Sequence, residues 1–439
     1  MDGALIMIQP PPRYRVAIDI GAAILGSPRF SSVLATATVA VALCSFALRQ
    51  IIGEAGLLAI LLSLVVLVAG SLAAQWANIG WRALVPISLM AFTLWTWLSV
   101  VWSQYTLESF AAVNYLLVFT VLGIYIALVR DTIQIVRAFG DVMRFVLVIS
   151  IGLEILTGLV FDTSLKALSI AGNLGTTDPI QGIFGARNQL GIIAVIALIT
   201  FATELRTRSV ERGLSIGSIV LGSLVLVLSQ SPLAFGTALV ILAASAALYA
   251  LRRVPSGRRR YWQFVLIGFV ATVAVISWLS RVAIVAWFDA SGDLTYRLRV
   301  WRQLWDLGEV HRLEGWGWIG PWNDEVAPFT AFGNFGGRVP DSAHNAYLDV
   351  WFQLGLVGFL IFVGLLGLAF MRSWLLASRR RSIVFAWPAL VLLALIVSAF
   401  AESSLLIEFG WLTFVVCCVK AARELSWRNA LDTKPQALS

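Results

Sequence analysis

The sequence predicts an all-α polytopic membrane protein, and three observations carry that prediction. Of its 439 residues, 59% are hydrophobic and 13% are charged, and the mean hydropathy of +0.87 lies outside the range of soluble domains. Apolar runs of about twenty residues recur along the chain, and each is long enough to cross a hydrocarbon core of roughly 30 Å as a helix. The short alternating segments typical of membrane barrels do not occur in the sequence.

The apolar runs predict about twelve transmembrane helices. They cover residues 33–48, 57–74, 83–101, 110–129, 142–161, 190–203, 214–228, 233–251, 262–286, 347–370, 383–400 and 405–419. Cys44, Cys417 and Cys418 fall inside these runs and are expected to be small core residues.

The basic residues predict the orientation. Most of the 32 Lys and Arg residues fall in short connections that share one side, which is the cytoplasmic side if the amino terminus is inside. The formal charge of +8 is therefore interpreted as a topology signal, and no nucleic-acid partner is expected. The first thirty residues show no apolar core followed by a small-residue cleavage site, so no removable signal peptide is expected.

This orientation predicts seven successive regions. They are a cytoplasmic segment at 1–30, spans 1–5 within 31–161, an outer loop at 162–189, spans 6–9 within 190–286, a large outer loop at 287–345, spans 10–12 within 346–419 and a cytoplasmic tail at 420–439. Loops as long as the two outer ones are usually functional in a compact protein. We therefore expect the chemistry outside the cytoplasmic membrane.

The large outer loop, between spans 9 and 10, contains a predicted lateral helix at 295–307. Leu298, Trp301 and Trp305 repeat at helical spacing and predict a buried face against the bundle, with Arg299 on the opposite face.

Two arginine motifs lie in the outer loops. Arg187 and Asn188 stand at the mouth of the sixth span, where an arginine either reaches the headgroups or binds an anionic ligand. Because Arg187 lies on the side otherwise poor in positive charge, the anionic ligand is favoured. Arg297 lies in the lateral helix, and a solvated helix face explains Arg299 and Arg302 better than it explains Arg297.

A histidine motif begins the tenth span. His344, one of two histidines in the chain, stands between a polar segment and an apolar run, where its imidazole meets water on one side and lipid on the other. A lone histidine is more often structural than catalytic. Here a helix amino terminus favours the neutral imidazole, which accepts a proton, whereas nearby Asp341 acts in the opposite sense.

Together these motifs resemble the O-antigen ligase and polymerase superfamily over residues 182–439. The matching segments are Phe184-Gly185-Ala186-Arg187-Asn188-Gln189-Leu190-Gly191, Arg297-x-x-x-Trp301, His344-Asn345 with Tyr347-Leu348, and Leu354-Gly355-Leu356-Val357-Gly358. Tyr296 replaces the glycine that commonly precedes the second arginine. Ala401-Glu402-Ser403 is similar to a segment of the exopolysaccharide-polymerase branch.

The resemblance implies glycosyl transfer, with inversion, from a polyprenyl-diphosphate-linked glycan to an acceptor hydroxyl at the outer face of the bacterial cytoplasmic membrane. It implies that Arg187 and Arg297 stabilise the diphosphate leaving group. His344 is then the general base or, alternatively, a cation that binds the diphosphate. Further substrate-binding residues are expected at Asn188, Asn345, Arg299, Tyr347 and Glu402. No cofactor and no metal ion are expected.

Three questions stay open at this point. A polymerase would use a second lipid-linked glycan as acceptor, as the Glu402 segment favours, whereas a ligase would use a lipid, a glycolipid or a protein. A transporter or flippase of lipid-linked sugars is an alternative, although no clear internal repeat supports it. A membrane scaffold with an outer binding loop explains the hydropathy but not the outer arginines and histidine.

Overall fold

The fold is a bundle of long helices. A computed structural model describes residues 21–76, 85–161, 163–168, 170, 172–176, 178–280, 291–333 and 339–424. In these ranges the chain has no strands, and seven helices are long and apolar enough to cross a membrane. The prediction of an all-α membrane protein is confirmed to that extent. Most of the predicted cytoplasmic segments 1–30 and 420–439 lies outside the described residues.

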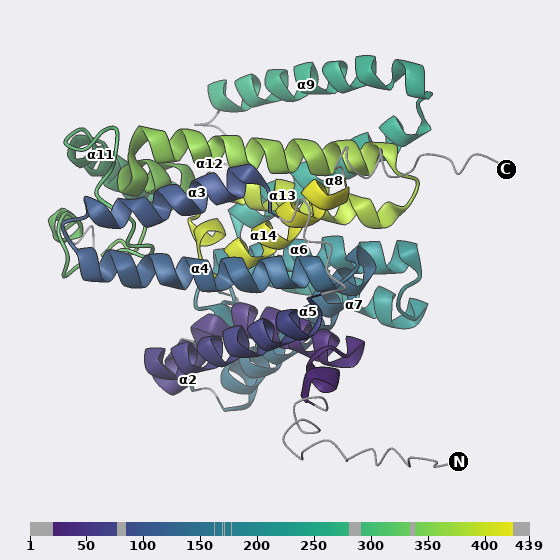
Figure 1. The fold of residues 1–439 in the computed structure, drawn as a ribbon, viewed down its shortest axis with the longest axis horizontal. Helices are drawn as coiled ribbons and strands as arrows, with labels where there is room; N and C mark the ends of the chain where they lie inside the picture. The colour runs from purple at the N-terminus through teal and green to yellow at the C-terminus, as the bar shows by residue number, and fades with distance from the viewer. Residues whose placement is uncertain are drawn as a thin grey trace, which may run out of the picture.

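The helices follow the apolar runs of the sequence (Figure 1). They are α2 (Pro28–Ala74), α3 (Ile87–Leu98), α4 (Thr106–Val129), α5 (Thr132–Ile155), α6 (Arg187–Thr207), α7 (Arg212–Ser229), α8 (Pro232–Arg253), α9 (Ser256–Leu279), α11 (Ser291–Gly308), α12 (Ala346–Arg379), α13 (Ala386–Ser398) and α14 (Glu408–Glu424). Short helical turns are η1 (Ser99–Val101), η2 (Leu156–Val160), η3 (Lys166–Leu168), η4 (Asn173–Gly175), η5 (Gly182–Phe184), η6 (Phe329–Ala331), η7 (Ile383–Phe385) and η8 (Ser404–Leu406).

Helix α2 contains two of the predicted spans. Its backbone leaves the helical region at Gly53, where φ is 74°, a value that glycine adopts at little cost. The chain then reverses direction, and two hydrogen bonds between the ends of α2 show this. Ser71 Oγ donates to the carbonyl of Leu25 at 2.9 Å, and the side-chain amide of Gln75 donates to Ser31 Oγ at 3.0 Å. The runs at 33–48 and 57–74 are therefore an antiparallel pair. With α3 and α13 shorter than a full span, the total of about twelve stays a prediction.

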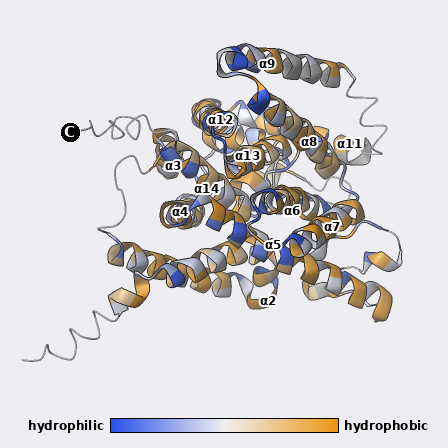
Figure 2. Cartoon of the chain, turned by 90° about the vertical axis from the view of Figure 1, so that its right-hand side faces the viewer, coloured by the Kyte–Doolittle hydropathy of each residue, from blue (hydrophilic) through white to orange (hydrophobic). Residues whose placement is uncertain are grey.

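Helices α6, α13 and α14 form the centre of the bundle (Figure 2). Helices α7 and α8 expose apolar side chains outward, as lipid-facing helices do. In the centre, the indoles of Trp387 and Trp411 donate to the hydroxyls of Thr200 and Thr120. Such bonds satisfy polar groups where no water is available and join neighbouring helices.

A break in α12 anchors the large outer loop. Gly355, with φ 68°, interrupts the helix and frees backbone groups on both sides of it. The loop satisfies them: the amides of Trp316 and Gly317 donate to the carbonyls of Phe352 and Gln353, and the amide of Leu356 donates to Arg312 at 2.9 Å. This exchange fixes the loop at one end of the bundle, beside α11, at the left of Figure 1.

Helix α11 covers the predicted lateral helix, but the predicted buried face is wrong in part. Val300 and Leu304 are fully buried, whereas Leu298 is 49% exposed and Trp305 is 51% exposed. Apolar spacing alone favoured the face that carries Leu298 and Trp305. The helix is rotated about its axis because the guanidinium of Arg297 and the indole N–H of Trp301, one turn later, both donate to backbone carbonyls of the histidine loop. Both groups must therefore face inward.

Replacing Gly355 with alanine is expected to destabilise the protein. The new Cβ would lie 2.1 Å from the carbonyl oxygen of Leu313, and the positive φ would strain any side chain. We expect a loss of at least about 1–3 kcal/mol in the free energy of unfolding, measured by denaturant titration in detergent. Gly364→Ala in the same helix is the control, because its Cβ meets nothing within 4 Å. Equal stability of the two variants would contradict the anchoring role of the break.

Candidate active site

One cavity brings together several of the charged residues at this end of the bundle. Its volume is about 780 Å³, and it lies where the amino end of α6, α11, the start of α12 and the connection between α13 and α14 meet. Arg187, Asn188, Arg297, His344 and Glu402 all line it. Segments separated by more than a hundred residues thus contribute to a single site.

Glu402 lies at the centre of this group. One of its carboxylate oxygens accepts from Asn188 Nδ2 at 2.7 Å and from Arg297 Nη2 at 3.2 Å. The side chain is 15% exposed. Burial alone would raise the pKa of Glu402, but the nearby imidazole of His344 and the charge of Arg297 outweigh that effect and lower it. The carboxylate is therefore ionised at neutral pH.

Asn188 is held from both sides. Its amide nitrogen donates to Glu402, while its carbonyl oxygen accepts from Ser231 Oγ at 2.7 Å. Ser231 also caps α8 through the amide of Ala234. The Ser-Pro pair at 231–232 signals a helix start but not this second contact, so sequence reasoning missed Ser231.

Arg297 joins three segments of the outer face. Its guanidinium donates to the carbonyl oxygens of His344, at 3.1 Å, and of Ala401, and it pairs with Glu402. Trp301, one turn further along α11, donates its indole N–H to the carbonyl of Ala343 at 2.7 Å. Helix α11 is thereby fixed to the histidine loop and to the Glu402 turn.

His344 has an unusual backbone and a half-enclosed ring. Its φ of 47° is left-handed, which is uncommon outside glycine and is often found at functional sites. Nδ1 is buried without a hydrogen-bond partner and lies 3.8 Å from Glu402 Oε2, while Nε2 lies 4.0 Å from Asp341 Oδ1. Both separations exceed hydrogen-bond length. A small shift of the ring would bring Nδ1 into contact with the Glu402 carboxylate.

Arg187 begins α6 and lines the same cavity, half-buried. The loop before it is fixed by Glu154, whose carboxylate accepts from the amides of Gln181 and Gly182, each at 3.1 Å. Gly185, with φ 70°, lies against the ring of Phe46. Glu154 thus braces the loop that leads into α6.

Asp349 is a second buried carboxylate and organises the floor of the site. It accepts from the indole of Trp322 at 2.6 Å, from the amide of Ala343 at 3.2 Å and from the hydroxyl of Ser403. Gln353, one turn later, accepts from the loop amides at 319 and 320. The indole and amide partners lie too far away in the chain to be inferred.

Three predicted substrate-binding residues lie outside the cavity lining. Asn345 caps α12 through the amides of Tyr347 and Leu348 and donates to the carbonyl of Phe400. Tyr347 donates to the carbonyl of Ile396 at 3.1 Å. Arg299 is exposed on α11. Asn345 and Tyr347 secure α12 to the end of α13, and a role of the three in substrate binding stays a prediction.

The site is a charged cavity at the ends of the membrane helices, lined by two arginines, one histidine and three carboxylates. Comparison with known proteins finds one family that matches part of the chain. The O-antigen ligase family matches residues 217–363, about a third of the chain, and the match includes Arg297 and His344. This match confirms the resemblance to the O-antigen ligase-like superfamily and indicates a ligase- or polymerase-type membrane enzyme. No curated protein matches the chain.

The lowered pKa of Glu402 predicts a pH-dependent contribution to stability. A carboxyl whose pKa is lower in the folded state than in the unfolded state stabilises the fold above its ordinary value, here 4.5, and loses that contribution as the pH falls through the folded value. Glu402→Gln should therefore be less stable than the wild type at neutral pH. The difference in unfolding midpoint should shrink below pH 4.5; a pH-independent difference would contradict the assignment.

Asp349→Ala should destabilise the protein because it leaves the indole of Trp322 and the amide of Ala343 buried without an acceptor. Each orphaned group costs about 1–3 kcal/mol. We expect a lower unfolding midpoint in detergent and faster proteolysis of the large outer loop. Asp324→Ala, in an exposed turn of that loop, serves as the matched control. Similar behaviour of the two variants would argue against Asp349 as the anchor.

Proposed function

We propose that this protein transfers a glycan from a polyprenyl-diphosphate donor to an acceptor hydroxyl at the outer face of the bacterial cytoplasmic membrane. The observation that carries the proposal is the convergence of Arg187, Arg297 and His344 in one cavity. The two arginines suit a diphosphate, the histidine suits an acceptor proton, and the apolar bundle suits a lipid-borne substrate. The family match supports the same class of reaction.

The reaction is a single displacement. The acceptor oxygen attacks the anomeric carbon, its O–H proton passes to Nε2 of His344, and the bond from the anomeric carbon to the diphosphate oxygen breaks. The bonding electron pair leaves with the polyprenyl diphosphate. One displacement inverts the anomeric configuration. Glu402 fits this course, because one carboxylate oxygen accepts from Asn188 and Arg297 and the other lies beside His344.

The arginines stabilise the charge that develops on the leaving group. A guanidinium is permanently charged and offers five N–H donors, more than the three contacts of Arg297 with the protein use. Preorganised donors of this kind act where charge forms in the transition state. In this proposal Arg297 both holds the site together and faces the diphosphate, while Arg187 approaches the diphosphate from α6.

His344 acts as the general base in this scheme, and Glu402 positions it. If Nδ1 carries its proton toward the carboxylate of Glu402, Nε2 keeps its lone pair on the side of the cavity. The neutral tautomer that accepts a proton is then the one that the carboxylate favours. Glu402 is thus a positioning residue in this proposal.

The preferred acceptor is a second lipid-linked glycan, which makes the enzyme a polymerase. The Ala401-Glu402-Ser403 segment favours this branch.

No metal ion is proposed to take part. Within the described part of the chain, no three His, Cys, Asp or Glu side chains gather into a possible metal site.

The direct test measures released polyprenyl diphosphate and elongated glycan from protein in nanodiscs, with a chelator present throughout. His344→Ala should lower the turnover number by about 10²–10⁴-fold, the usual contribution of a general base. His311→Ala is the matched control, since His311 pairs with Glu314 and does not line the cavity. Turnover that survives His344→Ala would reject His344 as the general base, and sugar flux across liposomes without transfer would replace this proposal with the transporter alternative.

A further inference from the structure

A dense group of arginines lies at the end of the bundle opposite the charged cavity, the end predicted to face the cytoplasm. The connection between α8 and α9 and the connection from α12 to η7 contribute all of them. They are Arg252, Arg253, Arg258, Arg259, Arg260, Arg372, Arg379, Arg380 and Arg381. Both turns lie at the right of Figure 1, away from α11. The sequence has no Asp or Glu within 249–263 or 370–385 to balance this charge.

The two connections form one surface, because side chains join them. Arg252 at the end of α8 donates from Nε to the carbonyl of Ala377 at 2.8 Å and from Nη2 to the carbonyl of Ser382 at 3.2 Å. Gln263 of α9 donates to Ser378 Oγ at 3.4 Å. Arg252 is thus used by the fold itself, and the other arginines of the surface remain for a ligand.

Five arginines of this surface are exposed: Arg253, Arg258, Arg379, Arg380 and Arg381. Arg253 lies over the ring of Tyr249, and Arg380 lies over the ring of Phe385. Within the ranges that the structure describes, none of the five pairs with a carboxylate. Like charges held together repel one another unless anions compensate them. The surface therefore favours anions from outside the protein.

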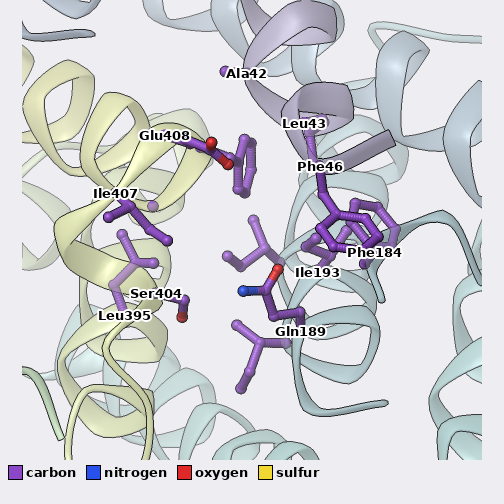
Figure 3. Close-up of a pocket in the computed structure, with 14 residues that line it drawn as sticks. Ala42, Leu43, Phe46, Phe184, Gln189, Ile193, Leu395, Ser404, Ile407 and Glu408 are labelled. Carbon is purple, nitrogen blue, oxygen red and sulfur yellow. The ribbon is translucent and has the colours of Figure 1, made fainter. Parts of the chain in front are cut away.

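Arginines elsewhere in the bundle have carboxylate partners. Arg49 pairs with Glu408, whose carboxylate Figure 3 shows beside an apolar pocket. Arg144 pairs with Asp141 and Glu204. A topology signal depends on Lys and Arg and very little on Asp and Glu, so it does not explain why both connections lack carboxylates.

Two aromatic residues place this surface at the level of lipid headgroups. Tyr261 and Trp262 follow the arginines directly on α9, and their side chains are 66% and 47% exposed. Tyrosine and tryptophan are enriched where a membrane meets water, because their rings are apolar and carry one polar group. The anions available at this level are the phosphates of phospholipids.

We propose that this surface binds the headgroups of anionic phospholipids in the leaflet that it faces. The headgroup phosphates bridge the two turns, with Arg258 on the α8–α9 side and Arg379 and Arg381 on the α12–η7 side. Each guanidinium offers a planar fork of N–H donors that matches phosphate oxygens. An anionic lipid is preferred to a zwitterionic one, whose headgroup carries a cation of its own. This site is independent of the reaction proposed for the outer cavity.

The test counts the lipids bound to the purified protein by native mass spectrometry. Phosphatidylglycerol and phosphatidylcholine with the same acyl chains are added at equal concentration to the protein in detergent. We expect about tenfold more bound phosphatidylglycerol, because each arginine near the headgroups adds to the attraction. Equal binding of the two lipids would overturn the proposal. Displacement of phosphatidylglycerol by an equal concentration of glycerol phosphate would also overturn it, since the ligand would then be a free phosphate.

The variant test replaces three exposed arginines of this surface, with the changes Arg379→Gln, Arg380→Gln and Arg381→Gln. The preference for phosphatidylglycerol should fall by about tenfold. Lysine at the same three positions keeps the charge and should keep most of the preference.

The matched control removes the same charge from the connection between α6 and α7, with the changes Arg206→Gln, Arg208→Gln and Arg212→Gln. These arginines are also exposed, but Glu204 and Glu211 lie among them in the sequence. The control should keep the preference for phosphatidylglycerol. Equal losses in the control and in the glutamine variant would contradict a site at the α8–α9 and α12–η7 turns. Because the readout needs no turnover, it is unaffected by the outcome of the His344 experiment.

Discussion

The outer face of this protein depends on one buried carboxylate. Glu402 pairs with Arg297 and accepts from Asn188, and its second oxygen lies beside His344. A charge enclosed by protein is costly unless it is paired and hydrogen-bonded, and removal of one partner leaves the other uncompensated. The four residues therefore stabilise one another's positions, although they belong to segments that are remote in the sequence. The contacts that join these segments at the outer end of the bundle also form the proposed site.

The rest of the outer face supports this carboxylate. The break at Gly355 lets the large loop take over backbone bonds of α12, and Asp349 fixes that loop to the histidine segment and to Ser403. Helix α11 packs against the histidine segment with Arg297 facing inward. Irregular backbone is thus placed where other protein groups satisfy it, the condition under which a membrane protein tolerates it.

The sequence predicted the class of fold and singled out a few candidate site residues, because hydropathy and short motifs depend on local composition. Arg187, Arg297 and His344 were inferred to act together, and the cavity brings them together. The facing of α11 was not predictable, since apolar spacing identified Leu298 while the donors at Arg297 decided the rotation. The hairpin at Gly53 and the hydrogen bonds to Asp349 depend on contacts between distant segments, which periodicity does not encode.

The central claim is that Glu402 holds His344 with Nε2 facing the cavity as a proton acceptor. The most direct measurement is the ¹⁵N spectrum of histidine-labelled protein, which contains only two imidazoles and is assigned with His311→Gln. In the neutral ring, the account predicts a protonated Nδ1 and an unprotonated Nε2 on His344, and loss of this preference in Glu402→Gln. A proton on Nε2 in the wild type, or a spectrum unaffected by Glu402→Gln, would contradict it.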